Sequence, residues 1–221
     1  MKSLEEQSNR DNIELKKLEH DFTSLLSQFN TDSKKIKDIF SKLVNVYSSE
    51  GRHYHNVCHI QAMLAFLEQH QENIKSFQTL FLATWYHDAI YDSKSQSNER
   101  DSAEMMKKDM SFLGLPEDII HSIYGLILAT QRHEQKIQDT DESLFLDADL
   151  SILSSSEHVY ATYSANIRKE YSWVSEEEYK KGRRGVLHHF LQRDTIYFSD
   201  VMTANDLIAR KNIEHEISQL N

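Results

Sequence analysis

Three short stretches of the sequence place imidazoles and carboxylates among apolar residues. They are RHYHNVCHI at 52–60, YHD at 86–88 and DADLS at 147–151. Burying an ionised carboxylate in an apolar setting costs several kcal/mol unless a cation or a dense hydrogen-bond network compensates the charge. The pattern therefore indicates a metal site or a buried polar network, and we interpret it as a metal site.

The candidate metal ligands are His59, His87, Asp88 and Asp149. Two imidazoles and two carboxylates form a mixed nitrogen and oxygen donor set, which suits one divalent Mn, Fe, Co, Ni or Zn ion and also accommodates Mg. Asp149 is preferred over Asp147 because it lies on the apolar side of the predicted helix. Asp147 lies about 200° away at 100° per residue, so we assign it to a cap or to a group that supports a ligand.

Helices must position these residues. Apolar residues recur at spacings of three and four along most of the chain, and five Gly and one Pro are far fewer than sheet-rich folds use. We expect an all-α fold. The predicted helices cover about residues 15–29, 36–47, 56–69, 74–91, 99–113, 117–130, 143–153, 157–171, 175–193 and 204–220.

The length of 221 residues fits one domain. We expect residues 1–10 (MKSLEEQSNR) to be a disordered N-terminal extension and residues 11–221 to form a single all-helical domain. The last predicted helix, over 204–220, carries an apolar stripe. The sequence leaves open whether this stripe packs within the chain or across a homodimer.

The formal net charge of −10 at pH 7 argues against a nucleic-acid polymer as partner, because a polyanion is bound by a basic stripe. The single cysteine excludes an internal disulfide, which is typical of a reducing compartment. The first ten residues contain no apolar signal-peptide core, and no run of about 18 apolar residues is present. We therefore expect a cytoplasmic protein with no membrane partner.

The order of the candidate ligands resembles the signature of the HD superfamily of metal-dependent phosphohydrolases, in which an isolated His, an adjacent His-Asp pair and a distant Asp hold the metal. YHNxxH and ADLS also resemble motifs of the cyclic-nucleotide phosphodiesterases, which belong to this superfamily. The longer run is similar to a small bacterial family described as predicted HD-superfamily phosphohydrolases. The matching segments are YHNVCHI, WYHDAIYD, NERDSA, LDADLSIL, IRKEYSWVSEEEY and GRRGVLHHFLQRDTIY.

This resemblance implies an HD-domain-like helical bundle with a central metal site. By analogy with the phosphodiesterases, His55 is the proton donor, and it shares a helix face with His59 if that helix begins early enough. Glu99 is the candidate for orienting the attacking water or acting as base. Phosphodiesterases carry a further His after the His-Asp pair, where this chain has AIYD at 89–92. We therefore expect one tightly bound ion and regard a second as doubtful.

Arg52, His133 and Arg183 are the basic residues whose motif contexts place them near the pocket, and we expect them to bind the anionic end of a substrate. The predicted function is hydrolysis of a phosphomonoester or phosphodiester of a small metabolite or nucleotide by a metal-bound water. Two alternatives stay open. One is a metal-loaded nucleotide-binding or regulatory module without catalysis, and the other is a metal-free helical interaction protein.

Overall fold

The computed structural model describes residues 2–29, 31–133, 135 and 139–220, with side chains described from residue 13 onward. The described residues form ten α-helices and no strand, so the predicted all-α class is confirmed. The helices are α1 (Lys2–Ser27), α2 (Ser33–Tyr47), α3 (Val57–Gln69), α4 (Phe77–Tyr86), α5 (Asn98–Leu113), α6 (Glu117–Ala129), α7 (Thr140–Leu150), α8 (Glu157–Glu170), α9 (Glu176–Leu191) and α10 (Asp206–Gln219). Three short 3₁₀ helices are η1 (Gln71–Asn73), η2 (Ser151–Ser154) and η3 (Asp200–Asn205).

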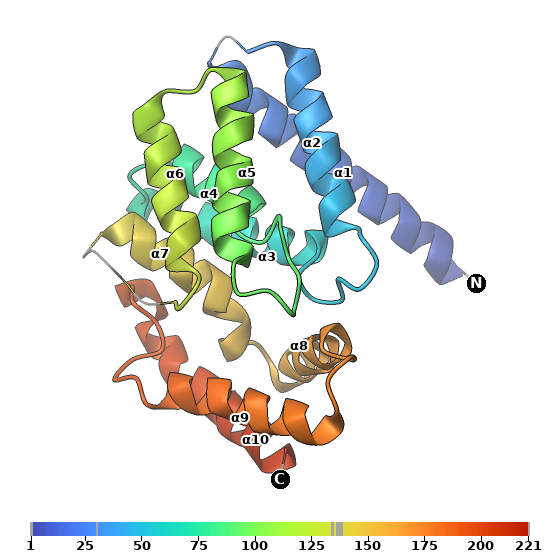
Figure 1. Ribbon diagram of the computed structural model, residues 1–221, viewed down its shortest axis with the longest axis vertical. Helices are drawn as coiled ribbons and strands as arrows, with labels where there is room; N and C mark the ends of the chain where they lie inside the picture. The colour runs from blue at the N-terminus through green and yellow to red at the C-terminus, as the bar shows by residue number, and fades with distance from the viewer. Residues whose placement is uncertain (1, 30, 134, 136–138, 221) are drawn as a thin grey trace.

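The helices form two groups (Figure 1), and the buried apolar residues form two hydrophobic cores. The larger core lies among α1–α7, and the smaller core lies among η2 and α8–α10 at the other end of the molecule. Helix α7 contributes to both, because Phe145 packs in the larger core and Leu150 in the smaller one. Asp149 therefore lies on the helix that joins the two cores.

Helix α4 is the central element of the larger core, and every residue from Thr79 to Tyr86 is buried. The Trp85 ring lies 5.8 Å from the Phe22 ring, 5.3 Å from Phe40 and 6.3 Å from Tyr47. Such aromatic pairs each contribute about 0.5–1.5 kcal/mol beyond the area they bury. The carboxyl end of α4, from which the His-Asp pair follows, is thus held from several sides.

Several helix ends differ from the expected ones, and two of the differences affect the site. Helix α3 begins at Val57, because the Asn56 side chain caps it by accepting a hydrogen bond from Cys58 N at 2.9 Å. His55 therefore lies in the loop before α3 and not one turn below His59 on the same helix. Helix α4 ends at Tyr86, so His87 and Asp88 leave it in a turn.

The sequence predicts that residues 1–10 form a disordered extension, and this stays a prediction. The structure continues α1 back to Lys2, while Met1 lies outside the described residues. Residues 2–10 contain neither Gly nor Pro and include the good helix formers Lys, Leu, Glu and Gln, which explains why the helix does not end earlier.

Helix α10 uses part of its apolar stripe within the chain, where Ala209 and Ile213 are fully buried in the smaller core. Leu207 on the same helix is 72% exposed. A homodimer stays a prediction. In the described part of the chain, no helix has the length and apolar character that crossing a bilayer requires.

Candidate metal centre

Three of the four predicted ligands converge on one point from α3, from α7 and from the turn that follows α4. His59 comes from the first turn of α3, His87 directly follows α4, and Asp149 lies near the end of α7. His59 Nε2 lies 3.1 Å from Asp149 Oδ1 and 3.2 Å from His87 Nε2, and His87 Nε2 lies 3.8 Å from Asp149 Oδ1. One donor atom from each residue lies within 4.8 Å of the others, so this cluster could hold a metal ion.

The imidazole of His87 is oriented as a metal-ligating imidazole would be. Its Nδ1 lies 2.9 Å from the carbonyl oxygen of Thr84, which can only accept, so Nδ1 carries the hydrogen. In the neutral ring, Nε2 then presents its lone pair to the cluster. The hydrogen bond from Nδ1 to the Thr84 carbonyl fixes the tautomer and the direction of the buried ring, as a divalent ion requires of a ligand.

The carboxylates of the cluster are ionised although they are buried. Burial would raise the pKa of Asp149, but hydrogen bonds from His133 and His59 outweigh it and hold that pKa well below its usual range. Burial likewise opposes ionisation of Asp88, whose pKa is nevertheless lowered by the charges of His87 and His55. Two carboxylates beside buried imidazoles favour a divalent cation in their midst.

The two imidazoles of the cluster respond to it in opposite directions. Burial lowers the pKa of His59, whereas for His87 the adjacent Asp88 carboxylate outweighs burial and raises the pKa to about 9. The cluster therefore attracts positive charge. The residues present fit a divalent metal ion.

Asp88 joins the cluster at its edge. Its Oδ2 lies 3.1 Å from His87 Nε2 and 3.9 Å from His55 Nε2. It is not one of the three residues whose donor atoms all lie within 4.8 Å of one another. Its role as the fourth ligand stays a prediction.

His133, predicted as a substrate-binding residue, lies against a candidate ligand. Its Nε2 is 2.8 Å from Asp149 Oδ2, and its ring packs 6.3 Å from the ring of Phe190. Its backbone has a positive φ of 47°, which is a left-handed conformation uncommon for a residue with a side chain. The left-handed backbone conformation thus occurs at the residue that contacts Asp149.

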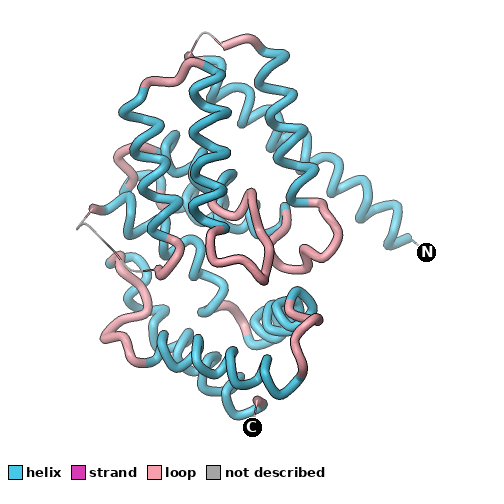
Figure 2. The backbone as a smooth tube through the Cα atoms, in the orientation of Figure 1, coloured by secondary structure: helices cyan, strands magenta, loops and turns pink. Residues whose placement is uncertain are grey.

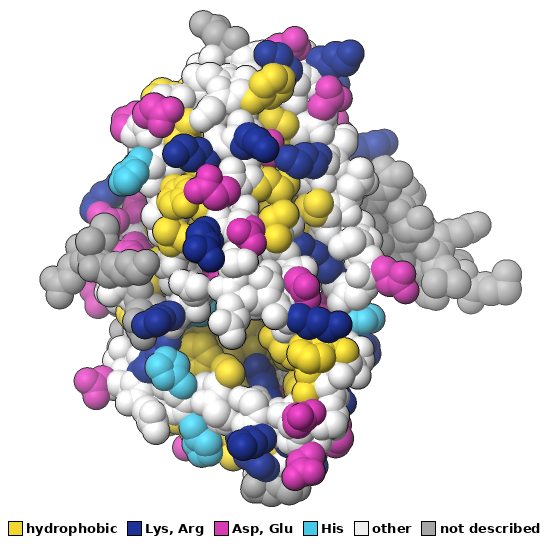
Figure 3. Space-filling view, in the orientation of Figure 1, with side chains coloured by type: hydrophobic (Ala, Val, Ile, Leu, Met, Phe, Trp, Pro, Cys, Tyr) yellow, Lys and Arg dark blue, Asp and Glu magenta, His cyan; other side chains and the backbone are white. Residues whose placement is uncertain are grey.

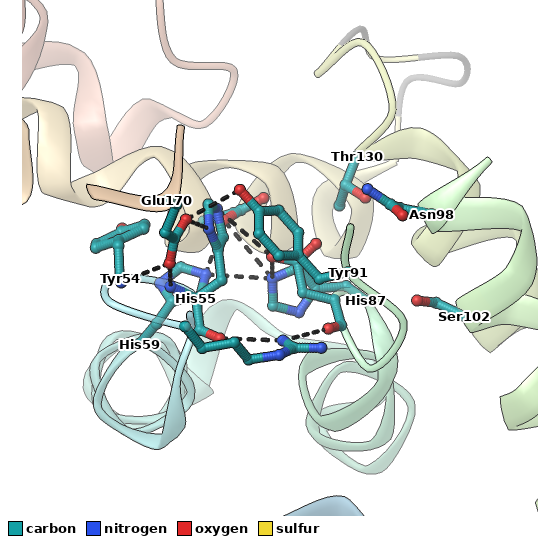
Figure 4. A network of polar contacts seen from close by, with 12 residues as sticks. Tyr54, His55, His59, His87, Tyr91, Asn98, Ser102, Thr130 and Glu170 are labelled. Atoms are coloured by element: carbon teal, nitrogen blue, oxygen red, sulfur yellow. Dashed lines mark hydrogen bonds and ion pairs between the residues drawn. The ribbon is translucent and has the colours of Figure 1, made fainter. Parts of the chain in front are cut away.

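His55 is held by a carboxylate that sequence reasoning did not find, Glu170 at the end of α8 (Figure 4). His55 Nδ1 lies 2.6 Å from Glu170 Oε2, which also accepts a hydrogen bond of 2.9 Å from the Tyr91 hydroxyl. The other oxygen, Oε1, accepts from the backbone N–H groups of Tyr54 at 2.7 Å and His55 at 3.0 Å. This arrangement leaves His55 Nε2 on the Asp88 side, 3.9 Å from Asp88 Oδ2.

The same contacts explain the charge states of this pair. Burial would raise the pKa of Glu170, but the hydrogen bond from His55 outweighs it and lowers the pKa to about 2. Burial would lower the pKa of His55, but the carboxylates of Asp88 and Glu170 raise it above its ordinary value. His55 is therefore set up to carry a proton.

A sequence signal for Glu170 does exist. It ends a helical stripe with spacings of three and four, formed by Tyr160, Tyr163 and Ile167, and it is buried. An acid on an apolar helix face is the signal that selects Asp149. Glu170 also lies within the IRKEY segment of the family resemblance.

Arg52 holds two loops together. Its guanidinium donates to the carbonyl oxygens of His55 at 3.0 Å, Asp88 at 2.7 Å and Ala89 at 2.9 Å. These loops, over residues 48–56 and 87–97, lie next to one another beside α8 (Figure 2). Arg52 is not among the residues that line the cavity beside the cluster. The structure thus places it where it positions the loops that carry His55 and Asp88.

The second loop is fastened to α5 by the NERDSA segment. The Asn98 side chain accepts a hydrogen bond from Asp92 N at 3.0 Å and donates to Asp92 O at 2.9 Å. The Ser102 hydroxyl contacts the backbone of Ile90 at 2.9 and 3.2 Å. Glu99 lies between these two residues in the first turn of α5 and lines the cavity.

Arg183 lines the cavity with its charge already compensated. Its Nε and Nη2 lie 2.8 Å and 3.0 Å from the two carboxylate oxygens of Glu216 on α10. The arginine side chain is 8% exposed and the glutamate side chain 6%. Such a bidentate buried pair leaves little free charge for a substrate anion.

Asp147, which the sequence assigns to a cap or to a group that supports a ligand, contacts the segment before η3 instead. It is fully buried, and it accepts hydrogen bonds from Phe198 N and Ser199 N, each at 2.8 Å, and from the Ser199 hydroxyl. Burial raises its pKa to about 6. Asp147 therefore fastens the segment before η3 to α7, while Asp149 points to the cluster.

A cavity of about 610 Å³ opens beside the cluster. His55, Asp88, His133 and Asp149 line it from the metal side, and α8 and α9 form another wall. Figure 3 shows a hollow between the two parts of the molecule, with hydrophobic side chains on its walls. Its volume is in the range of small-molecule sites, which is roughly 300–1,000 Å³.

Comparisons of the chain with protein-family models, with curated proteins and with solved structures found no match. The resemblance to the HD superfamily therefore rests on the sequence motifs. The structure establishes an all-helical fold of the described residues. It also establishes a cluster that could hold a metal ion, formed by His59, His87 and Asp149.

Proposed function

We propose that this protein is a metal-dependent phosphohydrolase that cleaves a phosphomonoester or phosphodiester of a small metabolite or nucleotide. The observation that carries the proposal is the convergence of His59, His87 and Asp149 at the edge of a cavity that His55 also lines. A candidate cation site, the proposed proton donor and room for a small ligand thus lie together. Hydrolysis of a phosphate ester uses all three.

The donor set determines how the ion would be held. His59, His87 and Asp149 would bind it, with Asp88 as the predicted fourth ligand. When bound, a divalent ion supplies Lewis-acid activation of water near neutral pH and compensates charge on the phosphoryl group. The mixed nitrogen and oxygen donors favour Mn, Fe, Co, Ni or Zn and allow Mg.

The chain's own residues supply the proton transfers. A bond forms between the water oxygen and phosphorus, and the bond between phosphorus and the alcohol oxygen breaks. His55 gives a proton to the leaving alcohol oxygen, while Glu170 holds the imidazole in place through Nδ1. Glu99 lines the same cavity and is the proposed acceptor of the proton that the water loses. A general acid of this kind contributes about 10²–10⁴-fold to the rate.

The test uses protein purified without a chelator and without a histidine tag. Its metal content is measured by elemental mass spectrometry, and its turnover of nitrophenyl phosphate and bis-nitrophenyl phosphate is measured with added Mn²⁺. We expect close to one ion per chain and turnover that EDTA abolishes. His121→Ala, which removes an exposed imidazole on α6, is the control variant.

His87→Ala and Asp149→Asn are the diagnostic variants. Each should lose the ion and lower the turnover by about 100-fold or more, the range of a general catalytic group. Unchanged turnover in both would disprove the proposal. Stoichiometric metal with no turnover on any phosphate ester would instead favour a metal-loaded binding or regulatory module.

A further inference from the structure

The wall of the cavity formed by α8, α9 and the segment between them is largely aromatic. Tyr163 comes from α8, Tyr171 and Trp173 from the connecting segment, and Tyr179, Val186 and Phe190 from α9. Pockets lined in this way bind flat apolar groups by area and by ring contacts.

Helix α9 presents one continuous face to the cavity. Tyr179, Gly182, Arg183, Val186 and Phe190 all line it, and their spacing of three, four, seven and eleven positions places them on one side of a helix. A Cβ atom added at Gly182 would meet nothing within 4 Å. The glycine therefore leaves open space on the cavity face of the helix.

Trp173 lines the cavity and is held in place by neighbouring side chains. Its Nε1 donates to Ser93 Oγ at 2.8 Å, and the Lys94 ammonium lies 5.1 Å from the ring centroid. The Tyr171 ring stacks on it at 6.5 Å with an angle of 28°. Trp173 is nevertheless 52% exposed, so part of its surface remains open to a ligand.

The charges along this cavity limit what can bind. Arg183 is the only lysine or arginine among the described residues that line it, and its guanidinium is paired with Glu216. The other charged side chains away from the cluster are the acids Glu99 and Glu178. A second phosphate or carboxylate against the α9 wall would meet only the paired Arg183 and the acid Glu178, so its charge would not be compensated there.

From these observations we infer the substrate class, and the inference rests on the proposed function. The substrate is the ester of a single phosphate with an alcohol that carries an uncharged, flat aromatic group. The phosphate lies at the His59, His87 and Asp149 cluster, and the aromatic group lies against the α9 wall. Sugar phosphates and polyphosphates are disfavoured, since they offer hydroxyls or further anionic charge to the largely aromatic wall formed by α8, α9 and the segment between them.

Binding of the alcohol part alone tests the inference without any turnover. Naphthylethanol and glycerol are titrated by calorimetry into full-length protein stripped of metal with EDTA. We expect naphthylethanol to bind at least about tenfold more tightly, as apolar groups do in hydrophobic pockets. Equal affinities, or no binding of naphthylethanol, would overturn the inference.

Two glycines of α9 provide a matched pair of variants. Gly182→Leu places a side chain on the cavity face, whereas Gly185→Leu adds the same side chain at a position that does not line the cavity. Neither added Cβ meets an atom within 4 Å, so both variants should fold, which circular dichroism checks. We expect only Gly182→Leu to weaken naphthylethanol binding, by about tenfold. Equal effects of the two substitutions would contradict the assigned wall.

Turnover separates this inference from the proposed function. Naphthylethyl phosphate and glycerol phosphate have alkyl leaving groups of similar basicity, so kcat/KM with Mn²⁺ compares recognition and not reactivity. A preference of about tenfold or more for naphthylethyl phosphate is expected. Metal-dependent turnover that favours glycerol phosphate or pyrophosphate would overturn the substrate class but keep the function. Selective naphthylethanol binding with no turnover of any ester would overturn the proposed function but keep the aromatic wall as a binding surface.

Discussion

Two buried charge networks lie on either side of the cavity, and their partners differ. In the first, the carboxylates of Asp88, Asp149 and Glu170 are contacted by imidazoles. In the second, Glu216 is contacted by the guanidinium of Arg183 and by the hydroxyls of Tyr160 and Ser164. Imidazoles can give up a proton or bind a metal ion, whereas a guanidinium keeps its charge and its geometry.

The difference explains why one network is a candidate centre and the other joins helices. The Arg183 and Glu216 pair connects α9 to α10, and Tyr160 and Ser164 connect α8 to the same carboxylate. Every oxygen of Glu216 is thereby satisfied within the described residues. In the imidazole network, a cation of higher charge can replace the protons that the rings share with the carboxylates.

The largest expected effect comes from removing an imidazole of the first network. His59→Ala should abolish stoichiometric metal binding and lower the turnover of a phosphate ester by about 100-fold or more. Arg183→Met should leave the bound metal unchanged, since Arg183 contacts Glu216 and Tyr163 and none of the cluster. Elemental mass spectrometry of both variants makes the comparison. Loss of metal in Arg183→Met would show that the two networks are not separate.

The second network should dominate stability. Glu216→Leu leaves the buried guanidinium unpaired and should lower the free energy of unfolding by about 3–5 kcal/mol, as for other broken buried pairs. The double variant Arg183→Met with Glu216→Leu replaces both charges by apolar groups. It should recover most of this loss, because no uncompensated charge remains. Urea unfolding followed by far-ultraviolet circular dichroism measures both, and a double variant no more stable than the single one would contradict the interpretation.

The sequence predicts one of these networks much better than the other. Periodic apolar residues predict the all-α fold, and acids and imidazoles on apolar faces predict His59, His87 and Asp149, because both signals are local. The pairing of Arg183 cannot be predicted from local sequence, because its partner Glu216 lies 33 positions away. An arginine near a pocket has the same sequence pattern whether its charge is free or paired.

Whether a residue near a helix end lies in the helix or in the adjoining loop can be predicted only as accurately as the helix end itself. The expectation that His55 shares a helix face with His59 depends on where α3 begins. Asn56 caps α3, so the helix begins at Val57 and His55 lies one residue before the cap. The role of Arg52 also depends on a tertiary contact, because its guanidinium donates to the carbonyl oxygen of Asp88, which lies 36 positions away. Local spacing carries no information on such a contact.

A smaller effect is expected at Glu170, and it depends on pH. Its pKa is lowered from an ordinary value of 4.5 to about 2, against burial and mainly by the hydrogen bond from His55. A lowered carboxyl pKa contributes stability that is fully present above pH 4.5 and is lost as the pH falls toward about 2. Glu170→Gln should remove about 1.5–3 kcal/mol at pH 7, the range for hydrogen bonds to charged groups.

The difference between wild type and Glu170→Gln should therefore shrink as the pH falls from 4.5 to about 2. Urea titrations across this range measure it, and a difference that stays constant would refute the assigned charge state.

Because Glu170 also positions His55, Glu170→Gln should lower kcat by about 10–100-fold with bound metal retained, as for other groups that orient a catalytic residue. A merely structural role would leave kcat of the folded fraction unchanged.

The smallest effect concerns the helix between the two networks. Gly182 and Gly185 lie inside α9, where glycine costs roughly 0.5–1 kcal/mol relative to alanine because of its backbone freedom. A Cβ at either position meets nothing within 4 Å, so Gly182→Ala and Gly185→Ala should each raise the free energy of unfolding by about that amount. Urea unfolding of the two variants and of their combination measures the gain, which should be additive if only propensity acts. Destabilisation by Gly182→Ala alone would mean that the cavity face of α9 is already filled, and that the wall facing the imidazole network is closed.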